Sequence, residues 1–323
     1  MAKARRIKGI DCNGAANAGI KLVLAGRFSE LSKLREAALN WNDPEGVHSM
    51  RVASRRLRSA LRDFAPFLRK RGLASSLRQI KQIADALGEV RDQDVAIDAL
   101  EKLRSTAPQE VSVIVGELIS IREVARNKAR QELKQTIAKA HLKQLNRHFL
   151  AAVDVATAPK AQRGQTPSGP TYVDMARSII LDRLKELEKL SNSLYRPLEV
   201  EPLHDMRIGA KRLRYAIELF QECWGADIAA FAAEAARMQT TLGDLHDCDV
   251  WIESFGELIL ESKKKNEQDQ NDQFSWLLSH FIHVRNNHFD DAFDIWREWE
   301  ARGMSDMLRR VLSPPTTEPA TEN

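Results

Sequence analysis

An internal duplication limits the architecture of this chain more than any other feature of its sequence. The segment HSMRVASRRLRSALRDF, residues 48–64, has a counterpart in HDMRIGAKRLRYAIELF, residues 204–220, at an offset of 156. A second block, LGEVRDQDV from Leu87, corresponds to LGDLHDCDV from Leu242 at an offset of 155. Two blocks in the same order at nearly the same spacing predict two similar units that pack about a pseudo-twofold axis.

The sequence around both copies is typical of helices. The 323 residues include 15 Gly and 11 Pro, gathered at a few places, and alternating Val/Ile/Thr runs with hairpin dipeptides are missing. We therefore expect an all-α fold. The densest group of helix-breaking residues lies at 156–171 and predicts a linker. The expected order is a basic disordered N-terminus (1–15), a first helical repeat (16–155), the linker (156–171), a second helical repeat (172–312) and a disordered tail (313–323).

The net charge of +4 is distributed unequally between the two halves. Residues 1–155 contain 29 Lys and Arg against 17 Asp and Glu, whereas residues 156–323 contain 20 against 28. The first half is therefore strongly basic and the second is acidic. This asymmetry predicts an anionic partner that is bound mainly by the first half.

The first motif copy predicts a helix with one cationic face. At about 100° per residue, five basic or titratable side chains fall within an arc of roughly 80°: His48, Arg51, Arg55, Arg58 and Arg62. The apolar residues of the segment, Met50, Leu57, Leu61 and Phe64, lie nearly opposite and are expected in the core. The cationic face is about 21 Å long at 1.5 Å per residue. The second copy repeats the pattern, with His204, Arg207, Lys211 and Arg214 in front and Met206, Leu213, Ile217 and Phe220 behind.

The composition of this face favours binding of a polyanion over an ordinary solvated surface. Solvated helix faces usually alternate acids with bases, because like charges at i+3 or i+4 repel. Residues 51–71 contain eight Arg or Lys and one acid, Asp63, and seven of the eight are Arg. A row of planar guanidinium forks suits a linear chain of phosphates better than a compact small molecule. His48 and His204 either add a donor that titrates near neutrality or serve as structural caps or buried hydrogen-bonding groups.

The second block leaves two interpretations open. In the first, the Gly and Asp residues end one helix and cap the next, with Asp92 or Asp94 accepting backbone N–H bonds. Alternatively, Asp92 orients Arg91 toward the cationic face. In the second copy His246 replaces Arg91, which predicts a weaker or pH-sensitive site there.

Other basic and histidine residues give weaker signals. Four basic residues after Pro108 either line the opposite wall of the same groove or form an ordinary exposed face: Arg122, Arg126, Lys128 and Arg130. His280 and His283 have a spacing compatible with metal binding, but no acidic or Cys partner is in register, and the chain has no Cys-x-x-Cys. We therefore expect no metal site.

Enzyme, cofactor and membrane signatures are missing from the sequence. There is no phosphate-binding loop, zinc-protease motif, nucleophile elbow or dinucleotide-binding loop. The candidate sites consist mainly of Arg, which is a poor general base, so they indicate binding without catalysis and without a cofactor. No stretch approaches the roughly 18 apolar residues of a membrane span, and the N-terminus lacks the apolar run of a secretory signal. A cytoplasmic location is therefore expected.

The doubled motif His-x-x-Arg-x-x-x-(Arg/Lys)-Arg-Leu-Arg, followed by Leu-Gly-x-x-(Arg/His)-Asp-x-Asp-Val, resembles the CHAD family (conserved histidine α-helical domain). The resemblance covers about residues 16–312. It implies two four-helix bundles related by pseudo-twofold symmetry, a basic central groove, and binding of inorganic polyphosphate, in bacteria also at polyphosphate granules. The residues that match the family's motifs are His48, Arg51, Arg55, Arg56, Arg58, His204, Arg207, Lys211, Arg212 and Arg214, with Arg91 in the downstream block. Arg62 extends the row of the first copy.

Three departures leave open whether both repeats bind the ligand equally. Lys211 stands where the first copy has Arg55, Glu218 where it has Arg62, and His246 where it has Arg91. The expected function is non-enzymatic polyphosphate binding. Two alternatives are a nucleic-acid-binding helical module, which would add base stacking by aromatic residues, and a metal-dependent phosphohydrolase that uses the histidines.

Overall fold

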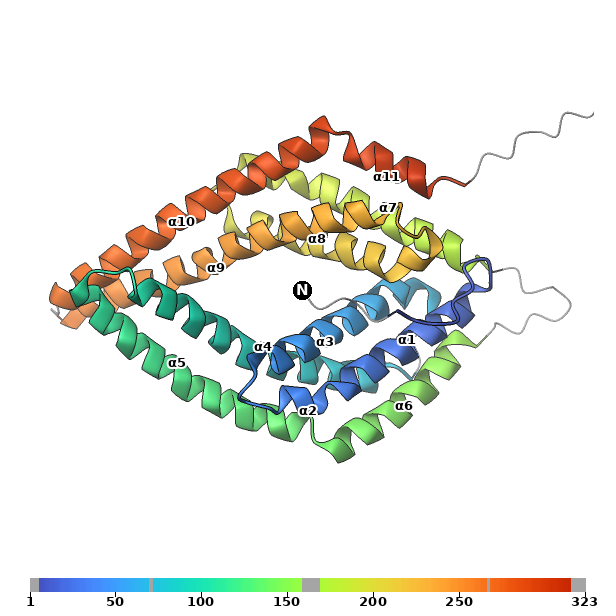
Figure 1. The fold of residues 1–323 in the computed structure, drawn as a ribbon, viewed down its shortest axis with the longest axis horizontal. Coiled ribbons are helices and arrows are strands. Elements are labelled where there is room, and N and C mark those ends of the chain that lie inside the picture. Colours follow the sequence, from blue (N-terminus) through green and yellow to red (C-terminus); the bar gives the residue numbers. More distant parts are fainter. Residues whose placement is uncertain (1–5, 70–71, 159–168, 266–267, 315–323) are drawn as a thin grey trace, which may run out of the picture. The chain divides into compact units, whose positions relative to one another are not determined.

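The computed structural model describes residues 6–69, 72–158, 169–265 and 268–314, and within these ranges the chain is helical and has no strand (Figure 1). The prediction of an all-α fold is therefore confirmed. An isolated antiparallel bridge joins Ala15 and Thr171. Most of the predicted linker and tail, and the first five residues, lie outside the described residues.

Most of the helices follow one another with short connections, whereas residues 158–171 separate α6 from α7. In chain order they are α1 (Ala16–Lys33), α2 (Arg35–Ala38), α3 (Pro44–Phe64), α4 (Ala74–Arg104), α5 (Gln109–Thr136), α6 (Lys139–Thr157), α7 (Tyr172–Leu190), α8 (Val200–Phe220), α9 (Ala229–Lys265), α10 (Gln268–Ala301) and α11 (Met304–Leu312). Short 3-10 turns follow three of them: η1 (Ala65–Phe67), η2 (Ser191–Tyr195) and η3 (Gln221–Cys223). Over the described residues, none of these helices combines the length and the low polarity that a bilayer crossing requires.

The start of α3 is fixed by local chemistry. Oδ1 of Asp43 accepts a hydrogen bond from the backbone N–H of Glu45 at 3.0 Å, and Pro44 occupies the first helical position. An acidic N-cap satisfies a backbone donor that the helix leaves unpaired, and proline at the first position needs no donor of its own. The position at which α3 begins is therefore fixed, and with it the side of the helix on which His48 and the following arginines lie.

The predicted core faces of α3 and α8 are confirmed. In α3, Met50, Leu57 and Phe64 are completely buried and Leu61 is 6% exposed. In α8, the corresponding residues Met206, Leu213, Ile217 and Phe220 are all completely buried. Each helix thus turns its opposite, basic side away from its own core.

The described chain divides into two compact units. The first contains residues Met1–Tyr172 and Cys248–Val284, and the second contains Val173–Asp247 and Arg285–Asn323. The long helices α9 and α10 are therefore each divided between the units. These units are defined by contacts, whereas the predicted repeats 16–155 and 172–312 are defined by sequence similarity. The repeat boundaries and the pseudo-twofold relation remain predictions.

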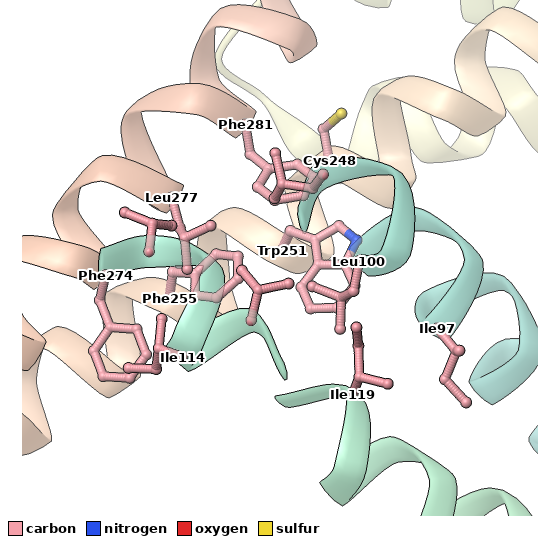
Figure 2. Close-up of a cluster of buried hydrophobic side chains, with 13 residues drawn as sticks. Ile97, Leu100, Ile114, Ile119, Cys248, Trp251, Phe255, Phe274, Leu277 and Phe281 are labelled. Atoms are coloured by element: carbon pink, nitrogen blue, oxygen red, sulfur yellow. The ribbon is translucent and has the colours of Figure 1, made fainter. Parts of the chain in front are cut away.

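An aromatic core explains why parts of α9 and α10 belong to the first unit (Figure 2). Residues of α4 and α5 pack there against Trp251 and Phe255 of α9 and against Phe281 of α10. The rings of Trp251 and Phe255 stack with their centroids 5.5 Å apart, and those of Phe255 and Phe281 lie 5.7 Å apart. Aromatic side chains bury large apolar areas, so this cluster binds helices that are far apart in the sequence into one body.

Candidate anion-binding site

The first unit presents a cationic face on α3. Arg58 is exposed, and His48, Arg51, Arg55 and Arg62 are partly exposed. All five lie on the side of α3 that is opposite its buried apolar residues, as the wheel predicts. The face therefore remains accessible to an anion over about four turns of helix.

Arg91 extends this face from the neighbouring helix α4. The blocks Leu87–Val95 and Leu242–Val250 lie inside the continuous helices α4 and α9, so the interpretation of a helix break with caps is wrong. Their glycines do not end a helix, because one helical Gly costs only about 1 kcal/mol and tertiary packing routinely overrides local propensity. Since α3 packs against α4, Arg91 lies near His48 and contributes to its electrostatic environment.

Gly88 and Asp92 position Arg51. Nη2 of Arg51 lies 3.2 Å from Oδ1 of Asp92, which is an ion pair across α3 and α4. A Cβ at position 88 would lie only 2.8 Å from Nη1 of Arg51, so glycine leaves the space that the guanidinium occupies. The carboxylate of Asp92 thus orients Arg51, whereas the sequence suggested Arg91.

His48 is held in its neutral form. Burial lowers its pKa, and the positive charges of Arg91 and Arg55 lower it further, while Glu45 acts in the opposite direction. A bound anion would oppose the effect of the two arginines and favour the protonated imidazole. His48 can therefore donate a hydrogen bond to an anion in either state and can gain a charge when one binds.

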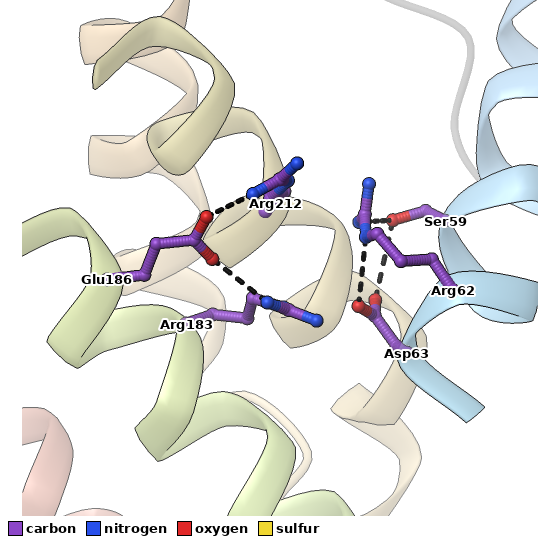
Figure 3. Close-up of polar contacts among 6 residues, drawn as sticks. All are labelled: Ser59, Arg62, Asp63, Arg183, Glu186 and Arg212. Carbon is purple, nitrogen blue, oxygen red and sulfur yellow. Dashed lines mark hydrogen bonds and ion pairs between the residues drawn. The ribbon is translucent and has the colours of Figure 1, made fainter. Parts of the chain in front are cut away.

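Arg62 is tied back to its own helix (Figure 3). Its Nη2 donates to Oγ of Ser59 at 2.6 Å, and its Nε lies 3.4 Å from Oδ1 of the buried Asp63. Asp63, the single acid among residues 51–71, therefore offsets the charge of Arg62. Arg51 of the same face is likewise paired with Asp92, so carboxylates of the chain offset part of the positive charge of the face.

Arg56 and Arg212 occupy equivalent triads in the two units. Glu30 accepts from Nη1 of Arg27 at 2.8 Å and lies 3.8 Å from Nη1 of Arg56, which is 7% exposed. In the second unit, Glu186 likewise bridges Arg183 and Arg212 (Figure 3). All three positions are related by the offset of 156. A carboxylate shared by two guanidiniums indicates that Arg56 and Arg212 stabilise their units.

Arg214 differs from its counterpart Arg58. It is only 6% exposed, its Nε donates to Oε1 of Glu218 at 2.7 Å, and its Nη1 lies 3.4 Å from Oε1 of Gln239. Glu218, which replaces Arg62 of the first copy, has therefore neutralised an arginine of the motif. The second unit presents fewer cations than the first.

A histidine pair takes the place of Arg91 in the second unit. Nδ1 of His204 and Nδ1 of His246 lie 3.3 Å apart, and Nη2 of Arg207 lies 3.5 Å from the same atom of His204. Burial and the nearby Arg207 lower the pKa of both imidazoles, that of His246 to about 4. Both rings are therefore neutral at pH 7, which leaves Arg207 and Lys211 as the cations of this face.

Three of the four basic residues of α5, Arg122, Arg126 and Arg130, share one face of the helix and contact other parts of the first unit. Nη1 of Arg126 and Nη2 of Arg130 each lie 3.7 Å from Oδ1 of the buried Asp94, and Arg130 also lies over the ring of Trp41. Arg122 lies over the ring of Trp251. Lys128 is exposed and points to another side of the helix. These arginines hold α5 to its neighbours.

His280 lies among aromatic side chains. The ring of His280 stacks on that of Trp276 at 5.5 Å and meets Phe281 edge-on. Within the described ranges, no three His, Cys, Asp or Glu side chains gather in a way that could hold a metal ion.

The sequence reasoning missed four features: Gly88 as the space for Arg51, the contact of His204 with His246, and the two triads built on Glu30 and Glu186. The triads had a signal, because Arg27 and Glu30 repeat as Arg183 and Glu186 at the same offset of 156. The other two features depend on which residues of neighbouring helices meet, and no single motif contains that information.

Comparison with known families and relatives agrees with the helical architecture. The family model described as CHAD domain matches residues 22–255. Two curated relatives from strains of Mycobacterium tuberculosis, the uncharacterized proteins Rv2226 and MT2285, are 27% and 26% identical over 209 residues. Each match covers 63% of this chain and 38% of the relative, so the chain spans less than half the length of these relatives.

Two solved structures share the fold. The crystal structure of the CHAD domain from the plant Ricinus communis is 21% identical, covers 96% of both chains and superposes with a TM-score of 0.66. PptA from Streptomyces chartreusis is 12% identical, covers 88% of this chain and 100% of its own, and superposes with a TM-score of 0.63. At these identities the likeness concerns the fold alone.

Proposed function

Because this chain belongs to the CHAD domain family, we propose that it binds inorganic polyphosphate through the basic faces of its two motif copies without hydrolysing the polymer. The observation that supports this proposal most directly is the face of α3, where Arg51, Arg55 and Arg58 follow one another on the accessible side of one helix. Each guanidinium can donate to two phosphate oxygens at once. The binding of polyphosphate at cellular granules belongs to the same proposal.

The two copies should contribute unequally. The first unit presents His48, Arg51, Arg55, Arg58 and Arg91. In the second unit, Arg214 is neutralised by Glu218 and a neutral His246 replaces Arg91. We therefore assign the larger part of the binding free energy to the first unit, in agreement with its excess of basic residues. The central groove lined by both copies remains part of the proposal.

The side chains of the face favour binding over catalysis. Guanidiniums remain protonated and stabilise negative charge, but they do not remove protons at neutral pH. The aromatic residues of the two motif helices are buried: Phe64 and Phe220 completely, and Tyr215 to 7% exposure. They are therefore not available to stack on nucleobases. A phosphate polymer without bases therefore fits the face better than a nucleic acid does.

The test is a titration of size-fractionated polyphosphate over a series of salt concentrations. Affinity should rise with chain length, and the logarithm of the association constant should fall linearly with the logarithm of salt, because each phosphate contact releases counterions. Replacing Arg51, Arg55 and Arg58 together by Ala should reduce the salt slope by about 2 to 3 and the affinity by about 100-fold, at about 1 kcal/mol per cation.

The matched control removes the same charge from another helix. Lys139, Lys143 and Arg147 are exposed on α6 at a spacing of four residues, and their replacement by Ala should change the affinity by less than about threefold. Equal losses in the two triple variants would show nonspecific attraction by net charge. Preferred binding of single-stranded DNA in competition would favour a nucleic-acid module, and phosphate released with divalent metal ions would favour a phosphohydrolase.

A further inference from the structure

Helix α5 has an apolar patch on its outer side that the fold does not cover. Val113 is 61% exposed, Ile121 is 64% exposed and Val124 is 72% exposed. At about 100° per residue these side chains fall within an arc of about 80°. The buried residues of α5, including Val115, Ala129 and Leu133, lie on the opposite side and pack inside the first unit. Ile121 and Val124 lie one turn apart and form the centre of the patch, whereas Val113 lies about 12 Å from Ile121 along the helix, beyond Glu117. An exposed apolar patch rimmed by polar residues is typical of an interaction surface.

Charged residues flank this patch in a symmetrical order. Glu117 and Lys128 are exposed on the same side of α5 as Ile121 and Val124. Residue 117 precedes Ile121 by four positions, and residue 128 follows Val124 by four positions. Both pairs therefore have the same midpoint along the helix, with an acid toward the N-terminus and a base toward the C-terminus.

We infer that α5 forms a weak homodimer by antiparallel packing against α5 of a second copy. A twofold axis through the common midpoint places Ile121 against Val124 of the second copy, and Val124 against its Ile121. The same axis places Glu117 opposite Lys128 of the second copy, twice over. Symmetry makes such a surface complementary to itself, which is the requirement for an isologous dimer.

The charge order selects a second copy in one orientation. Parallel packing about the same patch would oppose Glu117 to Glu117 and Lys128 to Lys128, and like charges at such distances repel. The patch is small and its charged pairs are exposed, so the dimer belongs to the weak end of interface sizes. The proposed dimer surface uses none of the residues assigned to the first unit's polyphosphate-binding face, which are His48, Arg51, Arg55, Arg58 and Arg91.

The test is sedimentation velocity of the purified chain without polyphosphate, from about 2 to 200 µM, a range suited to weak complexes. The weight-average sedimentation coefficient should rise with concentration. Ile121→Glu should abolish this rise, because it places a carboxylate in the centre of the interface twice. Val155→Glu on α6, where Val155 is 58% exposed, is the matched control and should dimerise like the wild type.

Charge reversal tests the antiparallel arrangement. Lys128→Glu should raise the dissociation constant by about tenfold, because two attractive pairs become repulsive. The double variant Glu117→Lys/Lys128→Glu restores both pairs and should return the constant to within about twofold of the wild type. A monomer at all concentrations, unchanged association of Ile121→Glu, loss of association in Val155→Glu, or no recovery in the double variant would each overturn the inference.

Discussion

Replacing Gly88 by Ala should weaken polyphosphate binding without weakening the fold. An added Cβ would lie 2.8 Å from Nη1 of Arg51, whereas ordinary contact begins at 3.4 Å. The guanidinium must therefore move by at least about 0.6 Å, and it can do so because it is the far end of a flexible side chain. Its ion pair with Asp92, at 3.2 Å, would be disturbed.

The expected magnitudes have opposite signs for stability and for binding. A Gly-to-Ala change inside a helix stabilises it by about 0.5–1 kcal/mol, and an exposed ion pair contributes about 0–1 kcal/mol. The urea midpoint should therefore stay constant or rise. One misplaced cation near a polyanion costs up to about 1 kcal/mol, so the dissociation constant should rise by about two- to fivefold.

The assay compares Gly88→Ala with Gly243→Ala by urea denaturation and by titration with one polyphosphate fraction at fixed salt. Gly243 is the counterpart of Gly88 in the second copy, and a Cβ there would meet nothing within 4 Å. It should gain the same helix stability and keep its affinity. Wild-type affinity of Gly88→Ala, or an equal loss in Gly243→Ala, would refute the argument that Gly88 positions Arg51 for the ligand.

Three further predictions concern stability. Burial and Arg207 lower the pKa of His246 to about 4, so the unfolded chain binds a proton at this residue more readily than the folded chain does. Stability should therefore fall as the pH drops from about 6.5 toward 4. His246→Gln should flatten this part of the curve of Tm against pH. Glu186→Gln should lower the free energy of unfolding by about 1–2 kcal/mol, because two guanidiniums lose their shared carboxylate. Arg212→Ala should likewise lower stability but change polyphosphate affinity by less than about twofold. A large loss of affinity in Arg212→Ala would show that Arg212 contributes to binding. Phe255→Ala should cost about 3–5 kcal/mol in urea denaturation because the side chain is completely buried, and a cost below about 1 kcal/mol would contradict its place in the aromatic core.

The local features of the chain follow from its sequence because each depends on neighbours within a few residues. The helical character, the N-cap at Asp43 and the apolar faces that contain Met50 and Met206 are set by spacing along one helix. The cationic face of α3 follows in the same way, since the side of a helix that is not apolar must be the accessible one.

The role of each individual arginine could not be predicted from the spacing along one helix. Arg56 and Arg58 are two residues apart in one motif, yet the first is buried beside Glu30 and the second is exposed. Arg58 and Arg214 occupy equivalent positions, and only the second is neutralised, because Glu218 stands one turn away in its helix. The carboxylate partners decide how much charge each arginine offers, and most of these partners come from other helices.

The sequence by itself determined that the chain is helical, duplicated and basic along one helix of its first copy, because periodicity and charge are properties of consecutive residues. Only the tertiary structure decided which side chains meet across helices: Arg51 in the space above Gly88, His204 against His246, and Trp251 of α9 inside a core built with α4 and α5. These contacts join residues 37 to more than 150 positions apart, and the free energy that selects them comes from packing between helices, which the pattern within any one helix does not contain.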